Sequence, residues 1–279
     1  MQINGNTEII AHIGFPTHSF KSPMVYNPYF LQQGIDARVI PMGCDESDFS
    51  HVFPGIFRLS NLRGALITMP HKVAVMALID DISPTALIAG ACNAVKRGAD
   101  GRLKGDVFDG EGFIRGVQRK GVKLTGASAM VIGNGGVGSA IAASLAAAGV
   151  ASLALYDTHS ASSSSLAQRL CKHYPKLAVS TGSNDPAGFD LLVNASPLGM
   201  NEDDPLPIDI QRLDAATFVG EVVMRQEMTA FLAAAASRRC RFQVGSDMLF
   251  EQIPAYLEFF GFPATTAENL RSIAQLGQH

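Results

Sequence analysis

Short apolar runs alternate with longer amphipathic segments along the first hundred residues of the chain. Apolar runs of this length, bounded by glycine and polar residues, predict buried β-strands. The expected strands are Glu8–Gly14, Ala37–Met42 and Gly64–Thr68, with a hairpin formed by Cys92–Lys96 and Leu103–Gly105. The expected helices are Ser22–Gln33, which opens with Ser-Pro, a segment closing at Leu59–Leu62, and His71–Asp80.

The same alternation continues through the second half of the chain. Helices are expected over Gly110–Lys120, after Gly138 and over Thr229–Ser237, and strands near Leu153 and Val179 and over Leu191–Asn194, Phe218–Val222 and Arg241–Val244. The final segment, Ser246–Gln275, is predicted to be helical with an interruption at Gly261-Phe262-Pro263. Alternation of strands and helices predicts an α/β fold with mainly parallel sheets.

Composition narrows the function classes. The 279 residues are 47% hydrophobic and carry a net charge of −3, so the chain can bury a core and has no basic field to hold nucleic acid. No apolar run is long enough for a bilayer. The four cysteines form no C-x-x-C pair and the seven histidines form no H-x-x-x-H pair, so no metal site is expected. With no signal peptide visible, we expect a cytoplasmic protein with reduced thiols.

A glycine-rich turn is the most informative chemical feature. Gly133, Gly135 and Gly138 form G-x-G-x-x-G between an apolar run and an alanine-rich segment. In a strand–turn–helix arrangement, such glycines let a pyrophosphate approach the backbone at a helix N-terminus. The turn therefore predicts a dinucleotide site, with an ordinary glycine-rich turn as the alternative. Because about half of the chain precedes it, something other than the cofactor site is expected there.

The residue that would meet the adenosine ribose is Asp157. It ends the apolar run Ala151–Tyr156 and lies 24 residues after Gly133 in the numbering, near the spacing of about 20 found for such an acid. A carboxylate there binds ribose hydroxyls and repels a 2′-phosphate, and no arginine follows until Arg169. We therefore favour NAD over NADP. A solvated turn residue or a helix cap is the alternative for Asp157.

Polar residues follow several of the expected strands. Ligands of open α/β sheets bind beyond the carboxyl ends of the strands. Thr68 and Lys72 follow the third strand, Asn93 follows a short apolar run, and Asp109 lies between glycine-flanked segments at the expected domain junction. Lys72 is suited to proton exchange or oxyanion binding, and a carboxylate beside it would complete an acid–base pair. The alternatives are a surface lysine and a helix-capping aspartate.

Six motifs in order resemble the shikimate and quinate dehydrogenases over nearly the whole chain. The motifs of that family are G-x-P-x-x-x-S-x-S-P, N-V-T-x-P-x-K, G-A-V-N-T, G-x-N-T-D-G, N-A-T-P-x-G-M and G-x-x-M-L-x-x-Q. The matching segments here are Gly14–Pro23, Leu66–Lys72, Gly90–Ala94, Gly105–Gly110, Asn194–Met200 and Gly245–Gln252. Each motif alone is weak, and their common order makes the resemblance specific.

The resemblance implies roles for individual residues. Lys72 and Asp109 would be the catalytic pair, and the substrate would contact Ser22, Thr68, Asn93 and Gln252. The cofactor would contact the turn and the strand ends that follow it: Gly133, Asn134, Gly135, Gly136, Val137, Gly138, Asp157, Asn194, Ser196, Pro197, Val222, Gly245 and Met248. It also implies a substrate-binding domain at 1–108 plus 246–279, to which the last helices return, and a doubly wound Rossmann-type NAD(P) domain at 109–245.

The implied reaction interconverts a cyclic hydroxy acid and its ketone, as in aromatic amino acid biosynthesis. The departures from the motifs concern the substrate end: Phe20, Leu66, Ala94, Val107-Phe108 and Met224 replace polar residues. A carboxylate facing Phe20 and Met224 would lose charge-assisted hydrogen bonds. We therefore expect weak activity on shikimate or quinate, or a related cyclic or acyclic polyol as substrate. A non-catalytic nucleotide sensor is the alternative from another class, and the oligomeric state stays open, a homodimer among the options.

Overall fold

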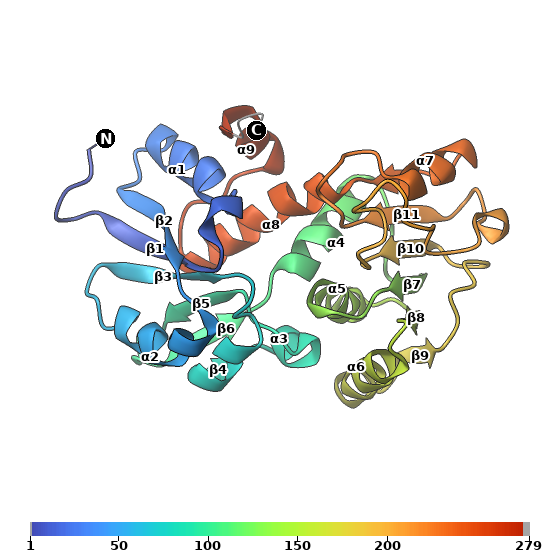
Figure 1. Ribbon diagram of the computed structural model, residues 1–279, viewed down its shortest axis with the longest axis horizontal. Helices are drawn as coiled ribbons and strands as arrows, with labels where there is room; N and C mark the ends of the chain where they lie inside the picture. The colour runs from blue at the N-terminus through green and yellow to red at the C-terminus, as the bar shows by residue number, and fades with distance from the viewer. Residues whose placement is uncertain (1, 276–279) are drawn as a thin grey trace. The chain divides into compact units, whose positions relative to one another are not determined.

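The computed structural model describes residues 2–275, and its chain divides into two compact units (Figure 1). The first contains the described residues up to Phe108 together with those from Ile253 onward, and the second contains Asp109–Gln252. The second boundary falls inside a helix, whereas the expected boundary at 245/246 coincides with the start of that helix. The α/β fold class is confirmed. Within the described part, every helix is too short or too polar to span a lipid bilayer.

The first unit is built on a mixed six-stranded sheet. Its strands are β1 (Glu8–Gly14), β2 (Ala37–Gly43), β3 (Leu62–Ile67), β4 (Asp81–Ile82), β5 (Ala94–Arg97) and β6 (Leu103–Asp106), in the order β2-β1-β3-β5-β6-β4. β1 pairs in parallel with β2 and β3, whereas β5 is antiparallel to both β3 and β6. The expected hairpin is therefore confirmed, and the carboxyl ends of β1 and β3 lie side by side.

Helices cover this sheet on both faces (Figure 1). They are α1 (Pro23–Gln32), α2 (Glu46–Ile56), α3 (Pro84–Ala89) and α9 (Ala267–Ile273), with short 3-10 turns at Thr17–Ser19 and Ala74–Leu78. The final segment of the chain contacts this unit: Tyr29 donates a hydrogen bond to the carbonyl of Pro263 at 3.0 Å, and Phe30 contacts Phe262. Phe49, Phe53 and Phe57 of the α2 region fill the core beneath β1 and β3.

Two expectations for the first unit are wrong. The helix expected to close at Leu59–Leu62 ends at Ile56, because Leu62 pairs with Ile9 and starts β3. The segment His71–Asp80 forms only the 3-10 turn at Ala74–Leu78. The carbonyl of Lys72 accepts a hydrogen bond from the N–H of Cys92 at 2.8 Å, so it is not part of a regular helical ladder. Tertiary pairing overrides the local apolar pattern at both positions.

The second unit is a doubly wound parallel sheet. Its strands are β7 (Ser128–Ile132), β8 (Ser152–Tyr156), β9 (Ala178–Thr181), β10 (Leu191–Asn194), β11 (Phe218–Glu221) and β12 (Phe242–Gln243). All described pairs are parallel, in the order β12-β11-β10-β7-β8-β9. The chain winds outward from β7 in both directions, so the strand order reverses between β7 and β10. A crevice at this switch point is where such sheets bind ligands.

The helices of the second unit are α4 (Asp109–Arg119), α5 (Gly136–Ala147), α6 (Ser160–His173) and α7 (Ala230–Ser237), with a 3-10 turn at Ile210–Arg212. α8 (Gly245–Phe260) begins in this unit. α4 packs against α5 so closely that a Cβ at Gly110 would overlap the carbonyl of Ala140. Close packing around β7 holds the first turn of α5 in a fixed position above the switch point.

Candidate active site

The glycine turn begins directly at the carboxyl end of β7. Gly133 has φ +86°, a conformation that side chains disfavour, and a Cβ there would meet the backbone of Ala195 and Ser196 at 2.5–2.7 Å. A Cβ at Gly138 would overlap the carbonyl of Gly133, so α5 can approach β7 only with glycine at this position. Gly135 and Gly136, in contrast, are exposed, with no atom within 4 Å of the point that a Cβ would occupy. These two positions leave room for a ligand at the N-terminus of α5.

Asp157 holds this turn from the end of β8. One carboxylate oxygen accepts a hydrogen bond from the N–H of Asn134 at 2.7 Å, and the other accepts one from the N–H of His159 at 2.9 Å. The Asp157 side chain is 17% exposed, so it still faces solvent above the turn. Asn134 is buried, and its side-chain oxygen accepts a hydrogen bond from Ser163 at 2.8 Å. Asp157 therefore combines a structural task with an accessible negative charge.

A cavity of about 460 Å³ lies at the switch point between β7 and β10. Its walls are the glycine turn, the end of β8 and the loop after β10, with lining residues Ile132, Gly133, Gly135, Gly136, Val137, Tyr156, Asp157, Thr158, Ala195, Ser196, Pro197, Leu198 and Pro207. Seven of the residues expected to bind the cofactor are among them, whereas Asn134 and Gly138 lie buried beneath. Open backbone, a helix N-terminus and an acid at the end of β8 fit a dinucleotide.

The loop after β10 is held by a buried glutamate that sequence reasoning missed. Glu221, at the end of β11, is completely buried and accepts hydrogen bonds from Asn194, from Thr229 at 3.0 Å, and from the N–H groups of Val222 and Val223 at 2.8 and 3.1 Å. Burial raises the pKa of its carboxyl group, and these donors oppose the shift. Its only sequence signal is an acid at the end of an otherwise apolar strand.

Asn194 connects Glu221 to the loop that forms one wall of the cavity. Its side-chain oxygen accepts hydrogen bonds from the hydroxyl of Ser196 at 2.6 Å and from the N–H of Ser196 at 3.2 Å, while its amide donates to the carbonyl of Leu198 at 2.9 Å. Ser196 and Leu198 line the cavity. The chain Glu221–Asn194–Ser196 therefore fixes the loop against which Gly133 packs.

The remaining expected cofactor contacts lie around the start of α8. A Cβ at Gly245 would overlap the carbonyl of Val223, so Gly245 packs directly on the Val222–Val223 backbone. Met248 is buried, and Gln252 lies close to α4, where a Cβ at Gly112 would sit 2.6 Å from its Cβ. The side-chain oxygen of Gln252 is buried without a hydrogen-bond partner in the described structure. None of Val222, Gly245 and Met248 lines the cavity at the glycine turn.

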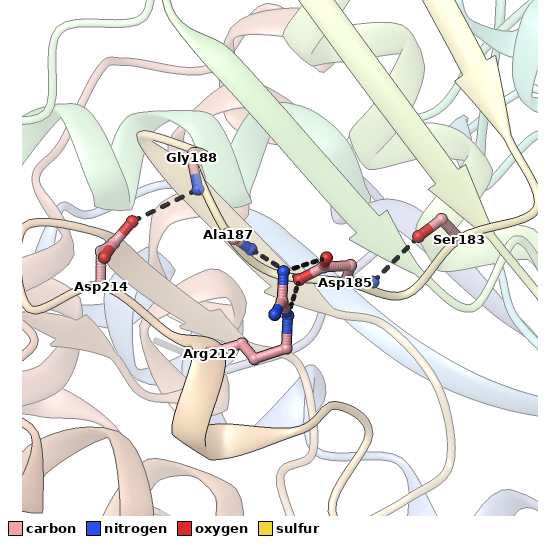
Figure 2. A network of polar contacts seen from close by, with 6 residues as sticks. All are labelled: Ser183, Asp185, Ala187, Gly188, Arg212 and Asp214. Carbon is pink, nitrogen blue, oxygen red and sulfur yellow. Dashed lines mark hydrogen bonds and ion pairs between the residues drawn. The ribbon is translucent and has the colours of Figure 1, made fainter.

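A polar network at the surface secures the segment that includes Pro207. Figure 2 shows Arg212 bound through two nitrogens to the Asp185 carboxylate, at 2.8 and 2.7 Å. The Arg212 guanidinium lowers the pKa of Asp185. Asp214 accepts a hydrogen bond from the N–H of Gly188 at 3.3 Å, and Asn184 donates to the carbonyl of Pro207 at 3.2 Å. These contacts join the loop before β10 to the segment that closes one side of the cavity.

In the first unit, backbone hydrogen bonds gather the expected substrate residues. Thr68 directly follows β3, and its N–H donates to the carbonyl of Ile13 in β1 at 2.9 Å. The N–H of Ile67 donates to the carbonyl of Asn93 at 2.8 Å, and Cys92 is bound in the same way to Lys72. Thr68, Lys72 and Asn93 are thus held together at the carboxyl ends of β1 and β3. Ser22 lies at the start of α1, and its side chain makes no capping hydrogen bond.

Asn93 is buried and also connects to the segment that leads into α4. Its side-chain oxygen accepts a hydrogen bond from the N–H of Phe108 at 3.0 Å, while its amide nitrogen is buried without a partner in the described structure. Asp109 follows Phe108 in the chain, is 6% exposed and begins α4, where the helix N-terminus favours a negative charge. An unpartnered buried amide beside Lys72 is suited to a ligand hydroxyl.

Within the first unit, the polar cluster borders apolar residues. Phe20 is half-buried and stacks on the ring of His12, with 4.0 Å between centroids, and Leu66 is buried in β3. Met224, which belongs to the second unit, is 46% exposed. No group of three metal-ligating side chains occurs within residues 2–275.

The doubly wound sheet and its cavity define a dinucleotide-binding α/β protein with a second, mixed-sheet unit. A family model described as "Shikimate dehydrogenase substrate binding domain" matches residues 13–95. A shikimate dehydrogenase (NADP(+)) of Rubrobacter xylanophilus is 33% identical over 241 residues, which cover 85% of this chain and 84% of the relative. The chain therefore belongs to the shikimate dehydrogenase family, a family of oxidoreductases.

Two solved structures similar to this chain are named for different substrates. A quinate dehydrogenase of Corynebacterium glutamicum in complex with NAD is 26% identical, with a TM-score of 0.84 over 96% of this chain and 98% of that one. A ligand-free 5-ketofructose reductase of a Gluconobacter species is 25% identical, with a TM-score of 0.86 over 97% of this chain and all (100%) of that one. Both likenesses extend over the two units.

Proposed function

We propose that the protein is an NAD-dependent dehydrogenase that interconverts a secondary alcohol and its ketone on a polyhydroxylated substrate of the shikimate or quinate type. The observation that carries the proposal is the pairing of two built sites in one chain. One unit has a cavity of about 460 Å³ at its switch point, and the other has Thr68, Lys72 and Asn93 gathered at the ends of β1 and β3. Membership of an oxidoreductase family supports this combination.

The first unit, residues 1–108 with the last helices, is proposed as the substrate domain, and the second as the cofactor domain. Lys72 would exchange the proton of the reacting hydroxyl, and Asp109 would hold and tune the lysine. Asn93 and Thr68 would orient ring hydroxyls, with Ser22 and Gln252 as further substrate contacts. The unpartnered amide of Asn93 and the unpartnered oxygen of Gln252 support these roles, because buried polar groups without partners are costly unless a ligand satisfies them.

The cofactor, when bound, supplies a nicotinamide that accepts or donates the hydride. The exposed backbone at Gly135 and Gly136 and the N-terminus of α5 would bind its pyrophosphate. Ser196 and Pro197, held by Asn194 and Glu221, would form the wall beyond it. Because the loop after β10 is already held in place, the nicotinamide half would bind without a rearrangement of this loop.

NAD is the proposed cofactor in preference to NADP. Asp157 carries a negative charge at the cavity, and no lysine or arginine is found among the described residues that line it. A 2′-phosphate would meet repulsion there without a compensating cation. The Rubrobacter relative is named for NADP, whereas the Corynebacterium structure contains NAD, so the electrostatics of this particular cavity carry the proposal.

A substrate and cofactor matrix tests the function. Purified protein is mixed with shikimate, quinate or their uncharged methyl esters and with NAD or NADP, and reduced cofactor is followed by its near-ultraviolet absorbance. We expect reduction of NAD, with NADP at least about 10-fold poorer in kcat/KM, a difference of about 1.4 kcal/mol. Absence of turnover with every combination, including the reverse reaction with the ketones, would contradict the proposed function.

A further inference from the structure

His12 is a polar residue in an apolar position of β1. It is 7% exposed, and its Nδ1 is buried without a hydrogen-bond partner in the described part of the chain. Its neighbours along the strand, Ala11 and Ile13, belong to the core on the opposite face. A histidine buried in this way is costly unless another group satisfies the ring. The position therefore calls for a partner that the described chain does not supply.

The surroundings of His12 place it in the substrate cluster of the first unit. Its ring stacks on Phe20 with an interplanar angle of 26°. Phe20 lies over Gly14, at 3.0 Å from the position of a Cβ there, and the methyl group of Thr68 would overlap the same Cβ. Thr68 and Lys72 belong to one loop, and Leu66 is the cross-strand neighbour of His12. His12 thus lies among the residues proposed to hold the substrate.

The ring of His12 is neutral under ordinary conditions. Burial, and then the positive charge of Lys72, lower its pKa to about 4. A neutral imidazole offers one donor and one acceptor, which is the complement of a hydroxyl group. A carboxylate only accepts hydrogen bonds and requires cations or several donors. The flanking Phe20 and Leu66 provide neither, and the cation whose charge reaches His12, Lys72, is assigned to the reacting hydroxyl in the proposed function. This part of the site is chemically matched to an uncharged hydroxyl.

We propose that His12 is a specificity-determining residue that binds a hydroxyl of an uncharged polyhydroxylated substrate. The proposal rests on the dehydrogenase function given above and narrows its substrate class. The substrate end beside Phe20 and His12 would be neutral, as in a cyclic polyol or a keto-sugar, instead of a carboxylate. The reaction is unchanged: the carbinol carbon gives its hydride to the nicotinamide, and the hydroxyl proton leaves through Lys72.

The name of one relative agrees with this substrate class. The 5-ketofructose reductase of the Gluconobacter species shares 25% identity and covers this chain almost completely. Its named substrate is a polyhydroxylated ketone without a carboxylate. The family fold therefore accommodates such a substrate, and His12 with Phe20 would be the residues that select it here.

The test compares each acid with its own methyl ester, so that only the charge at one end changes. Shikimate, quinate, their methyl esters and 5-ketofructose are assayed with the oxidised or reduced cofactor. We expect the neutral compounds to have kcat/KM equal to or above that of the acids. An acid preferred over its ester by about 10-fold or more would overturn the substrate class while leaving the dehydrogenase function intact. No turnover of any compound would overturn the function itself.

Variants connect the preference to His12. His12→Val is expected to raise KM for the preferred neutral substrate by about 10-fold with kcat changed less than about 3-fold, the pattern of lost binding without lost chemistry. His12→Asn, which keeps a donor and an acceptor, should restore part of the affinity. The matched control is His18→Val, at an exposed histidine. An unchanged KM in a folded His12→Val enzyme, shown by unchanged affinity for NAD, would refute the assignment.

Discussion

Replacing Asp157 with asparagine isolates the charge that we hold responsible for the choice of cofactor. The side-chain oxygen of asparagine can still accept the hydrogen bond that Asp157 takes from Asn134 at 2.7 Å. The amide group would then face the N–H of His159. Because His159 is an exposed residue, water can replace the lost acceptor. The glycine turn should therefore keep its conformation, and the variant should differ mainly in charge.

The size of the effect follows from Coulomb's law. Two unit charges about 5 Å apart at an effective dielectric constant of about 40, between bulk water and a protein surface, repel by about 1.7 kcal/mol. A phosphate monoester carries about 1.5 to 2 charges near neutral pH, which gives about 2.5–3.3 kcal/mol of repulsion. The 17% exposure of Asp157 allows screening by solvent and salt, so we expect about 2 kcal/mol, or roughly a 30-fold change.

The assay is the ratio of kcat/KM for NAD to that for NADP, measured at low and high salt. In Asp157→Asn this ratio should fall about 30-fold, and by less at high salt. The control is Asp190→Asn, since Asp190 also accepts a backbone hydrogen bond, from Ser128 at 2.8 Å, but lies outside the cavity. A ratio unchanged in Asp157→Asn, or equally changed in Asp190→Asn, would refute the electrostatic reasoning.

Two further predictions concern the frame of the cavity. Gly138→Ala places a Cβ against the carbonyl of Gly133. The resulting overpacking of about 1–3 kcal/mol should lower the denaturant midpoint and weaken NAD binding in calorimetry. The control Gly126→Ala is strained by its positive φ but lies away from the cavity, so it should reduce stability without weakening NAD binding. Glu221 has a raised pKa, so the folded state binds its proton more tightly, and the free energy of unfolding should fall as pH rises from 4.5 through the folded-state pKa. Glu221→Gln should remove this pH dependence of the free energy of unfolding, measured by denaturant titration at several pH values. If the pH dependence persists in the variant, Glu221 is not its origin.

The parts of the fold that repeat locally could be predicted from the sequence. The apolar run, the glycine turn and the alanine-rich segment predict β7 and α5. Each glycine of the turn is required by the local strand–turn–helix arrangement, which the sequence pattern itself shows. Asp157 could be placed by its distance from the turn, since β8 always follows α5 in such a unit. Its hydrogen bond to Asn134 was not foreseen, because it joins two strand ends.

The features that depend on distant partners could not be predicted. The segment after Lys72 has a helical pattern. The carbonyl of Lys72, however, accepts its hydrogen bond from Cys92, which lies 20 residues further along the chain. Glu221 and His12 looked like ordinary strand residues, and only their burial and their partners, or lack of one, mark them. The motifs mark Phe20 as a departure from the family, but its stacking on His12 joins two distant parts of the chain, so the pattern alone cannot predict it.

The most direct test of the account is the oxidation rate of Lys72→Ala with NAD and the preferred substrate. We predict a fall in kcat of about 100-fold or more, as expected for loss of a positioned acid–base group, with the dissociation constant for NAD unchanged. Lys21→Ala, at an exposed lysine, should retain full activity. A Lys72→Ala enzyme that binds NAD normally and turns over at close to the wild-type rate would contradict the proposed catalytic role of this residue.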